Sequence, residues 1–414
     1  MTRLNMHGPE FLHCTFAALP SYFAQHPFLF GWPELEAELG VILHAGGKAL
    51  RSRKERAAMR RRDVLVSAGS LAVAASFPAP AITQGIRQLK LVTDWPADMP
   101  GLQTSAVRIA RTIEQASGGR IKVEVFPAGT FVRAFETFEA VGGGLVDMYH
   151  SFEGYFASKS PALYFFSAIP FGFTANELIA WVQYGGGQEL WDELSGQFNI
   201  KPLLCTSSGC QMGGWFTHEV TSPLGFRGLR YRMAGPGAEV LRRLGASVVT
   251  LPGGEIMPAL QSGAIDASEW IGPWLDMSIG LHKAVGYYYY PGFHEPGSGF
   301  SLGINKRVWE SLDSGNRQLI EASAACEYTR SLAEFNANNA LSLHKLRQEG
   351  SVKIQKFNDS VLKAMREISR EVTAENGSGD EITKKIYASY QQFRNLITDW
   401  SDISERAVLN SRVV

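Results

Sequence analysis

Apolar residues alternate with polar ones, or recur at helical spacing, along the whole chain after residue 88. QLKLVTDW (88–95) and IKVEVF (121–126) have the two-residue period of strands. Between them, apolar residues from Leu102 to Ile113 form one helical stripe, which is followed by Gly118 and Gly119. A second helix is predicted from Phe131 to the glycines at 142–144, and LVDMYHS (145–151) is typical of a third strand. This alternation predicts an α/β sheet with helices on its faces.

A second α/β unit follows in the middle of the chain. GLRYRMAG (228–235), ASVVTLP (246–252) and AIDASEW (264–270) are predicted strands, and PGAEVLRRLG and GEIMPALQSG between them are predicted helices. Two such units predict two lobes with a cleft between them. Because ligands of open α/β sheets lie beyond the carboxyl ends of the strands, Arg232, Glu269 and Trp270 are candidate site residues.

The last part of the chain is mainly helical. Asp313 is a predicted N-cap of a long helix that reaches about Arg347 and ends at Gly350. SVKIQKF (351–357) is a predicted short strand, and helical patterns cover 360–374 and 380–402. We interpret these last helices as a tail on a two-lobed body, and as a possible dimerisation arm.

An export signal precedes the folded part. MRRRDVLVSAGSLAVAASFPAPAITQ begins at Met59 with an arginine cluster, continues with a short, weakly apolar stretch, and includes an A-x-A-like cleavage site at 79–81. The arginines ahead of a weak apolar stretch favour the twin-arginine route. The stretch is too short to span a membrane, which needs about 20 apolar residues. Residues 1–58 lie upstream of a signal that normally begins a chain, so translation from Met59 is one interpretation.

These patterns predict the following organisation: an upstream extension, 1–58; the export signal, 59–81; the first part of lobe 1, 82–210; lobe 2, 211–297; a return to lobe 1 with the long helix, 298–350; and the C-terminal helical segment, 351–414.

Composition and motifs exclude several classes of function. The 40 basic and 40 acidic side chains balance, which leaves no electrostatic signature of a nucleic-acid-binding or anionic-membrane-binding protein. The four cysteines form no CxxC pair, so a structural zinc site is not predicted. Cys205 and Cys210 are close enough in sequence for a local disulfide, although spacing alone does not determine pairing. No G-x-S-x-G, H-E-x-x-H or P-loop pattern occurs, and the histidines are scattered.

Glu269 poses a specific question. In a strand over AIDASEW its carboxylate shares a face with Ile265 and Ala267, and a buried carboxylate needs a partner. Gln211 precedes a glycine pair, where its side chain can serve a cation or a carboxylate. Arg232 is suited to bidentate capture of a carboxylate.

Several motifs together resemble one known family. QMGGWF, GLRYRMAG, AIDASEWIGP and YYYYPGFHE, with SAIPFGF and WVQYGGGQELW upstream, are similar to the DctP-type solute-binding proteins of TRAP transporters, and most similar to their 2-oxo acid-binding receptors. The resemblance covers the chain from about Leu89 to the C-terminal helices. It implies a periplasmic two-lobed α/β protein, with a mixed sheet in each lobe and a long C-terminal helical tail, that delivers its ligand to membrane permease subunits.

The resemblance also implies roles for individual residues. Arg232 would pair with the carboxylate of a pyruvate-like acid, and Tyr155 and Glu295 would add polar contacts. Gln211, Glu269 and Trp270 would hold a monovalent cation, sodium by expectation, and Gln211 and Trp270 would also contact the ligand. Homodimers through the C-terminal helices are a further implication. No catalysis is implied.

Two alternatives stay open at this point. The same receptor type can take a dicarboxylate, a hydroxy acid or a sugar acid, for which Arg230, Lys159 and Arg133 are possible second cationic groups. A secreted hydrolase with dispersed catalytic residues is the other alternative. For the receptor, we expect Arg232→Ala to abolish binding and to leave the melting temperature near that of the wild type.

Overall fold

The structure, a computed structural model, describes residues 85–412. The expected extension at 1–58 and the export signal at 59–81 lie outside the described residues. None of the described helices combines the length and the apolar character needed to cross a membrane.

The first sheet is mixed and has five strands in the order β2-β1-β3-β10-β4. β1, β2 and β3 run parallel, as the strand–helix alternation predicts, and β10 is antiparallel to both of its neighbours. The strands are β1 (Arg87–Thr93), β2 (Ile121–Phe126), β3 (Met148–Ser151), β4 (Ile200–Gly209) and β10 (Ser298–Asn305). The helical elements along this part are α2 (Leu102–Ala116), α3 (Thr137–Gly142), η1 (Glu153–Phe156), η2 (Pro161–Phe166), α4 (Ala175–Tyr184) and α5 (Gly187–Gly196).

The second sheet is also mixed and has six strands in the order β11-β9-β5-β8-β6-β7. β6 is parallel to β7 and β8, whereas β5 is antiparallel to β8 and β9. The strands are β5 (Gly214–Phe216), β6 (Arg230–Arg232), β7 (Ser247–Val249), β8 (Ala267–Ser268), β9 (Tyr287–Tyr290) and β11 (Lys353–Lys356). The helical elements between β5 and α11 are η3 (Pro223–Phe226), α6 (Gly237–Arg243), α7 (Gly253–Gln261), α8 (Pro273–Ser278), α9 (Leu281–Ala284) and α10 (Lys306–Glu310).

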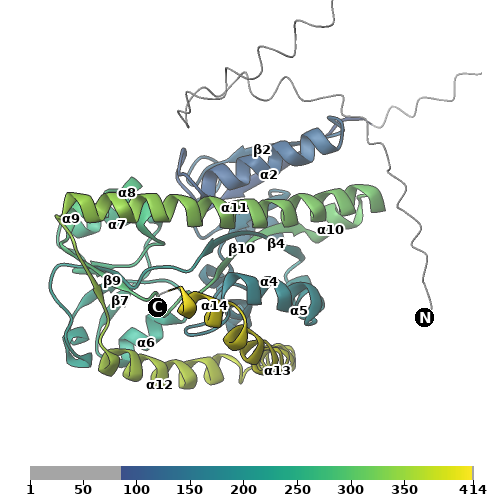
Figure 1. The fold of residues 1–414 in the computed structure, drawn as a ribbon. Helices are drawn as coiled ribbons and strands as arrows, with labels where there is room; N and C mark the ends of the chain where they lie inside the picture. The colour runs from purple at the N-terminus through teal and green to yellow at the C-terminus, as the bar shows by residue number, and fades with distance from the viewer. Residues whose placement is uncertain (1–84, 413–414) are drawn as a thin grey trace, which may run out of the picture. The chain divides into compact units, whose positions relative to one another are not determined.

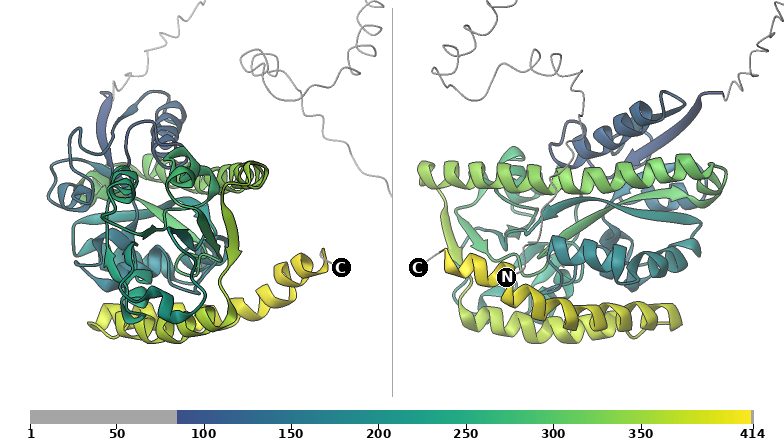
Figure 2. Two further views of the ribbon diagram at one scale, coloured as in Figure 1. Left: turned by 90° about the vertical axis from the view of Figure 1, so that its left-hand side faces the viewer. Right: turned by 45° about the vertical axis from the view of Figure 1, so that its right-hand side comes forward.

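The long helix α11 (Ser314–Glu349) packs against β4 and α2 on one side of the cleft and against α8 on the other. Asp313 caps it by accepting a hydrogen bond from the N–H of Asn316 at 2.8 Å, and Gly350 ends it with a φ of 65°. α12 (Asp359–Asn376), α13 (Glu381–Ile403) and α14 (Glu405–Ser411) follow. α11 runs along one side of the body, and α12 and α13 run along the opposite side (Figures 1 and 2).

Two predicted elements are shorter than their patterns indicate. The helix predicted from Phe131 begins only at Thr137, because the carboxylate of Asp94 accepts hydrogen bonds from the N–H of Phe135 at 2.7 Å and the hydroxyl of Thr137 at 3.1 Å. Phe135 itself has a φ of 70°, which is incompatible with a right-handed helix. The strand predicted over AIDASEW is reduced to β8, so Glu269 lies just beyond the strand end.

Candidate functional site

A small cavity lies between the two sheets, at the strand ends that the sequence indicated. Its wall includes all the residues predicted for the site: Tyr155, Gln211, Arg232, Glu269, Trp270 and Glu295. The remaining wall, which the sequence analysis did not foresee, consists of Trp95, Leu102, Phe152, Ala234, Ile271 and Phe300.

Short connections position the polar residues. Arg232 ends β6, Glu269 and Trp270 follow the neighbouring β8, and Gln211 follows β4. Glu295 lies on the segment that returns from β9 in the second sheet to β10 in the first. Both sheets therefore contribute to one cavity, so a ligand held there contacts both lobes.

Glu269 has a direct partner in Arg232. Its Oε1 accepts from Nη1 of Arg232 at 2.5 Å and from the N–H of Ala234 at 3.1 Å, and both side chains of the ion pair are 1% exposed. Burial raises the pKa of Glu269, but the charge of Arg232, the contact with His294 and the Ala234 N–H outweigh burial, so the net pKa is lowered. The carboxylate is therefore ionised and paired, which answers the question that its apolar surroundings raised.

The guanidinium of Arg232 is largely engaged by the protein. Nε and Nη2 donate to the carbonyl oxygen of Leu251 at 3.0 and 2.9 Å, and Nη1 also reaches the carbonyl oxygen of Glu269 at 3.3 Å. Together with Oε1 of Glu269, these contacts occupy up to four of the five N–H donors of an arginine. One N–H then remains for a ligand in this arrangement, in place of the bidentate fork that the sequence predicted.

Gln211 and Glu295 form a second polar cluster in the cavity wall. Nε2 of Gln211 donates to Oε2 of Glu295 at 2.6 Å and to Oγ of Ser298 at 2.9 Å, and Ser298 also donates to Glu295. Burial raises the pKa of Glu295 to about 7, and nearby Glu269 adds to the rise, whereas His294, Ser298 and Arg232 oppose it. Close to neutral pH, Glu295 therefore alternates between its neutral and its charged form.

The side-chain amide oxygen of Gln211, Oε1, has no hydrogen-bond partner among the described residues, although it is buried. Leaving a buried acceptor unpaired is costly, so this atom indicates a missing electropositive partner. Glu269 and Trp270 belong to the same cavity wall. Amide, carboxylate and carbonyl oxygens are the ligands that hard cations prefer, so these residues fit a bound cation.

The apolar wall is anchored by a buried hydrogen-bond chain. Nε1 of Trp95 donates to Nδ1 of His150 at 2.7 Å, and Nε2 of His150 lies 2.9 Å from Oγ1 of Thr206. Thr206 is 2.6 Å from Ser105, which donates to Oε1 of Glu327 on α11 at 2.8 Å. We call this chain the Trp95–Glu327 relay.

The direction of the relay follows from its end. The carboxylate of Glu327, held by Arg108, can only accept, so Ser105 donates to it, Thr206 donates to Ser105, and His150 donates through Nε2. Burial lowers the pKa of His150 to about 3, so its ring is neutral and Nδ1 is free to accept from Trp95. The relay thereby holds the Trp95 indole in one orientation in the cavity wall.

A family model for the bacterial extracellular solute-binding proteins, family 7 (DctP), matches residues 92–379. The chain belongs to this family. The resemblance found in the sequence is thus confirmed, and the protein is a solute receptor of the TRAP type.

Similar proteins support the same assignment. A monocarboxylate 2-oxoacid-binding periplasmic protein of a Nostoc species is 33% identical over 360 residues, which cover 85% of this chain and 98% of the relative. A TRAP periplasmic solute-binding protein from Pseudoalteromonas atlantica, solved with bound sodium and pyruvate, is 31% identical and has a TM-score of 0.76. The match covers 79% of this chain and 99% of that one.

Two further solved structures are similar to the receptor at the same level. The protein from Colwellia psychrerythraea, solved with calcium and pyruvate, is 30% identical with a TM-score of 0.76, and the match covers 79% of this chain and 100% of that one. A TRAP solute-binding protein from Bordetella bronchiseptica, a dimer with calcium and picolinate, is 32% identical with a TM-score of 0.77 and covers 79% and 97%. The predicted fold, with mixed sheets in two lobes and C-terminal helices, is confirmed by these likenesses.

The receptor shows no disulfide among the described cysteines. Cys205 is buried in β4 while Cys210, beyond the strand end, is exposed, so the local disulfide considered from spacing is not formed. The described residues also contain no group of three or more His, Cys, Asp or Glu side chains that fits a metal ion.

Proposed function

We propose that the receptor binds a small 2-oxo monocarboxylate such as pyruvate together with a cation. The observation that carries the proposal is the unpaired Gln211 oxygen in a cavity whose Arg232 charge is already balanced by Glu269. Because Glu295 can add a negative charge, the cavity offers an anionic ligand no net attraction of its own. A cation beside the ligand restores the balance.

The positions of the other basic side chains support a single carboxylate. Arg230 pairs with Asp266, Arg133 with Glu136 and Lys159 with Glu139, and none of these three basic residues lines the cavity. A dicarboxylate would therefore leave its second charge without a partner, which is costly in a buried site. The small volume of the cavity and the pyruvate bound by two of the similar structures agree with a compact ligand.

In this proposal, Arg232 donates its remaining N–H to the ligand carboxylate, and Tyr155 and Glu295 provide further polar contacts. Gln211, Glu269 and the Trp270 carbonyl hold the cation, and Gln211 and Trp270 also contact the ligand. The cation supplies the positive charge that the protein side chains lack. We favour sodium, because one positive charge balances one ligand carboxylate when Glu295 is neutral.

The proposal includes delivery without catalysis. Closure of the two lobes holds the acid, and no bond is made or broken. Receptors of this family work with membrane permease subunits and act outside the cytoplasm. We further propose export by the twin-arginine route and lobe boundaries at 82–210, 211–297 and 298–350. These boundaries are supported by the first sheet, β1–β4 and β10, and by β5–β9 of the second, to which β11 of the C-terminal segment is added at one edge.

A homodimer through the C-terminal helices is also part of the proposal. The end of α13 and α14 expose large apolar side chains: Leu396, Trp400, Ile403, Val408 and Leu409. Exposed apolar surface of this kind is typical of interaction sites. Light scattering should give twice the chain mass, and Trp400→Glu should shift the mass toward that of one chain; a wild-type monomer would contradict the dimer.

The ligand proposal is tested by calorimetry on the purified receptor in sodium buffer. We expect saturable binding of pyruvate and 2-oxobutyrate and much weaker binding of lactate, malonate and galacturonate. A thermal shift on adding pyruvate should accompany binding, because a ligand that binds only the native state raises its melting temperature. If the receptor bound malonate tightly and did not bind pyruvate, the proposed monocarboxylate ligand would be wrong and a dicarboxylate would be the better assignment.

The Trp95–Glu327 relay gives a separate prediction for affinity. His150→Phe keeps an aromatic ring but leaves the buried N–H of Trp95 unpaired, which costs about 1–3 kcal/mol. If the indole moves to recover a partner, pyruvate affinity should fall by roughly ten-fold, equivalent to about 1.4 kcal/mol. His150→Gln, which can accept from Trp95 and donate to Thr206, should recover most of the affinity. If calorimetry gave the same pyruvate affinity for the wild type and His150→Phe, the relay would not contribute to ligand binding.

A further inference from the structure

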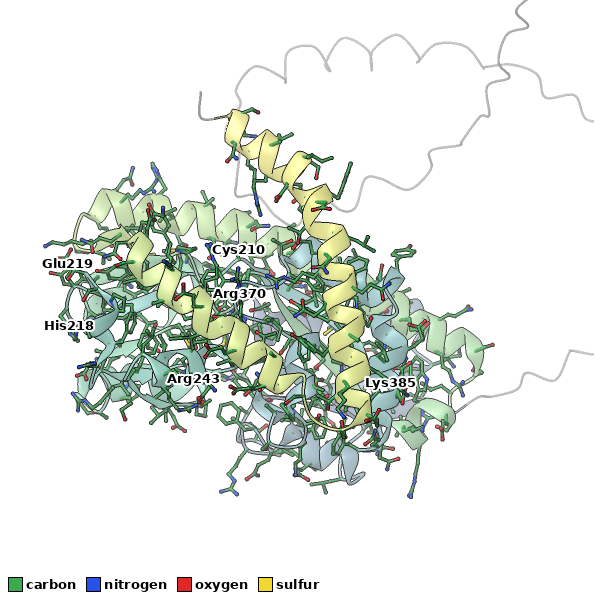
Figure 3. The ribbon with its side chains drawn as sticks, turned by 90° about the horizontal axis from the view of Figure 1, so that it is seen from below. Cys210, His218, Glu219, Arg243, Arg370 and Lys385 are labelled. Carbon is green, nitrogen blue, oxygen red and sulfur yellow. The ribbon has the colours of Figure 1, made fainter. Side chains whose placement is uncertain are left out.

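A second concave site lies on the face formed by the C-terminal helices and shares no lining residue with the cavity. Figure 3 shows this face, with Arg370 labelled. It is a groove of about 530 Å³ between α12, α13 and the segment at 170–171, with α14 at one end. Four arginines line it: Arg366, Arg370, Arg394 and Arg406. No aspartate or glutamate belongs to the lining, all of which falls in the described part of the chain.

Three of these four arginines have no ion-pair partner in the described part of the chain, although Glu177 and Glu405 line a neighbouring hollow that Arg394 and Arg406 also border. Arg406 pairs with Asp402 at 2.5 Å. In contrast, no carboxylate of the described residues forms an ion pair with Arg366, Arg370 or Arg394. Like charges held together in a groove repel one another, which a ligand of opposite charge would relieve.

The contacts around the groove keep these guanidiniums in place. The guanidinium of Arg366 lies over the ring of Phe171, 5.4 Å from its centroid, and Nη2 of Arg394 donates to the carbonyl oxygen of Phe171 at 2.9 Å. Two acids of α12, Glu371 and Glu375, pair with Arg243 of α6. Glu367, the remaining glutamate of α12, is exposed and does not line the groove.

The groove also joins the two lobes. α12 packs against α6 and η3 of the second lobe, whereas α13 packs against η2, α4 and α5 of the first. Its floor residue Phe171 donates from its N–H to the carbonyl oxygen of Phe293 at 2.7 Å, two residues before Glu295 of the cavity. A molecule in the groove would contact helices from both sides of the cleft.

We propose that this groove binds a compact soluble anion that carries two or more carboxylate or phosphate groups. Guanidinium forks recognise such groups with paired hydrogen bonds and keep their charge at any physiological pH. The hydroxyl of Tyr387 and the amide of Gln391 belong to the same lining and can serve the uncharged part of the ligand. The groove volume of about 530 Å³ lies within the range of small-molecule sites.

The test uses the full receptor, with citrate as the carboxylate probe and pyrophosphate as the phosphate probe. Calorimetry in calcium-free sodium chloride buffer of constant ionic strength should give saturable binding of one anion per chain. Arg366→Gln/Arg370→Gln should weaken that binding at least ten-fold. The matched control is Arg111→Gln/Arg120→Gln, which removes the same charge from two exposed arginines of the first lobe that form no ion pair within the described chain, and it should bind the probes as the wild type does.

Four results would overturn the proposal. The first three are absence of saturable binding by both probes, an equal loss of binding in the control variant, and displacement of the probes by pyruvate, which would place them in the cavity. The fourth is binding of a hexaglutamate peptide but of neither small anion, which would favour an acidic protein segment. Pyruvate affinity should stay unchanged in both double variants. The outcome for the groove is therefore independent of whether pyruvate is the ligand of the cavity.

Discussion

Arg232→Ala should abolish measurable pyruvate binding and also lower the free energy of unfolding by about 3–5 kcal/mol. Binding is lost because the cavity then has no cationic side chain to contact the carboxylate. Stability falls because Glu269, 1% exposed, keeps its charge without its partner at 2.5 Å. The sequence led us to expect an unchanged melting temperature, and the direct pairing of these two residues is the reason for revising that expectation.

A second variant separates the two effects. In Arg232→Ala/Glu269→Gln the orphaned charge is removed, so urea unfolding should show much of the lost stability restored while pyruvate binding stays absent. Arg232→Lys keeps a charge but loses the paired contacts to the carbonyl oxygen of Leu251, and should bind weakly. Wild-type affinity in Arg232→Ala, measured by calorimetry, would show that this arginine does not hold the ligand.

Local signals predicted much of the fold. Period-two alternation located β1 and β2, and the Asp313 cap and Gly350 delimited α11 within two residues of its ends. The missed parts depend on distant contacts. β10 shows little alternation of polar and apolar residues, so its sequence does not identify it as a strand. The reason is that all eight of its residues are buried between β3 and β4. α3 starts late because Asp94, more than forty residues away, captures the N–H of Phe135.

The candidate site, too, was predicted only in part. Its six polar and aromatic residues were predicted because the motifs that contain them have distinctive residue types in a distinctive order, and the structure places all six in one cavity wall. Trp95 and Phe300 were not foreseen, since an aromatic residue at the end or in the middle of a buried strand carries no sign of which face meets a cavity. The Trp95–Glu327 relay could not be recognised in the sequence either, because its members come from the segment after β1 and from β3, β4, α2 and α11.

Removing the cation should weaken pyruvate binding by at least ten-fold, equivalent to about 1.4 kcal/mol. The reason is the charge balance of the cavity: Arg232 and Glu269 cancel, and the ligand adds a negative charge to a buried site. Calorimetry in choline chloride with a chelator, against sodium chloride and against added calcium, measures the effect. Gln211→Leu, which deletes the unpaired oxygen, should give the same weak affinity in all three buffers.

The pH dependence of this affinity tests which cation suits the cavity. The pKa of Glu295 is raised to about 7, so between pH 6 and pH 8 its side chain loses a proton and adds a negative charge. In sodium, pyruvate affinity should therefore fall over this interval, whereas calcium, with its second charge, should lose less or gain. In Glu295→Gln, pyruvate affinity should be the same at pH 6 and at pH 8. Equal affinity with and without every cation, at either pH, would contradict the cation site and leave the Gln211 oxygen unexplained by ligand binding.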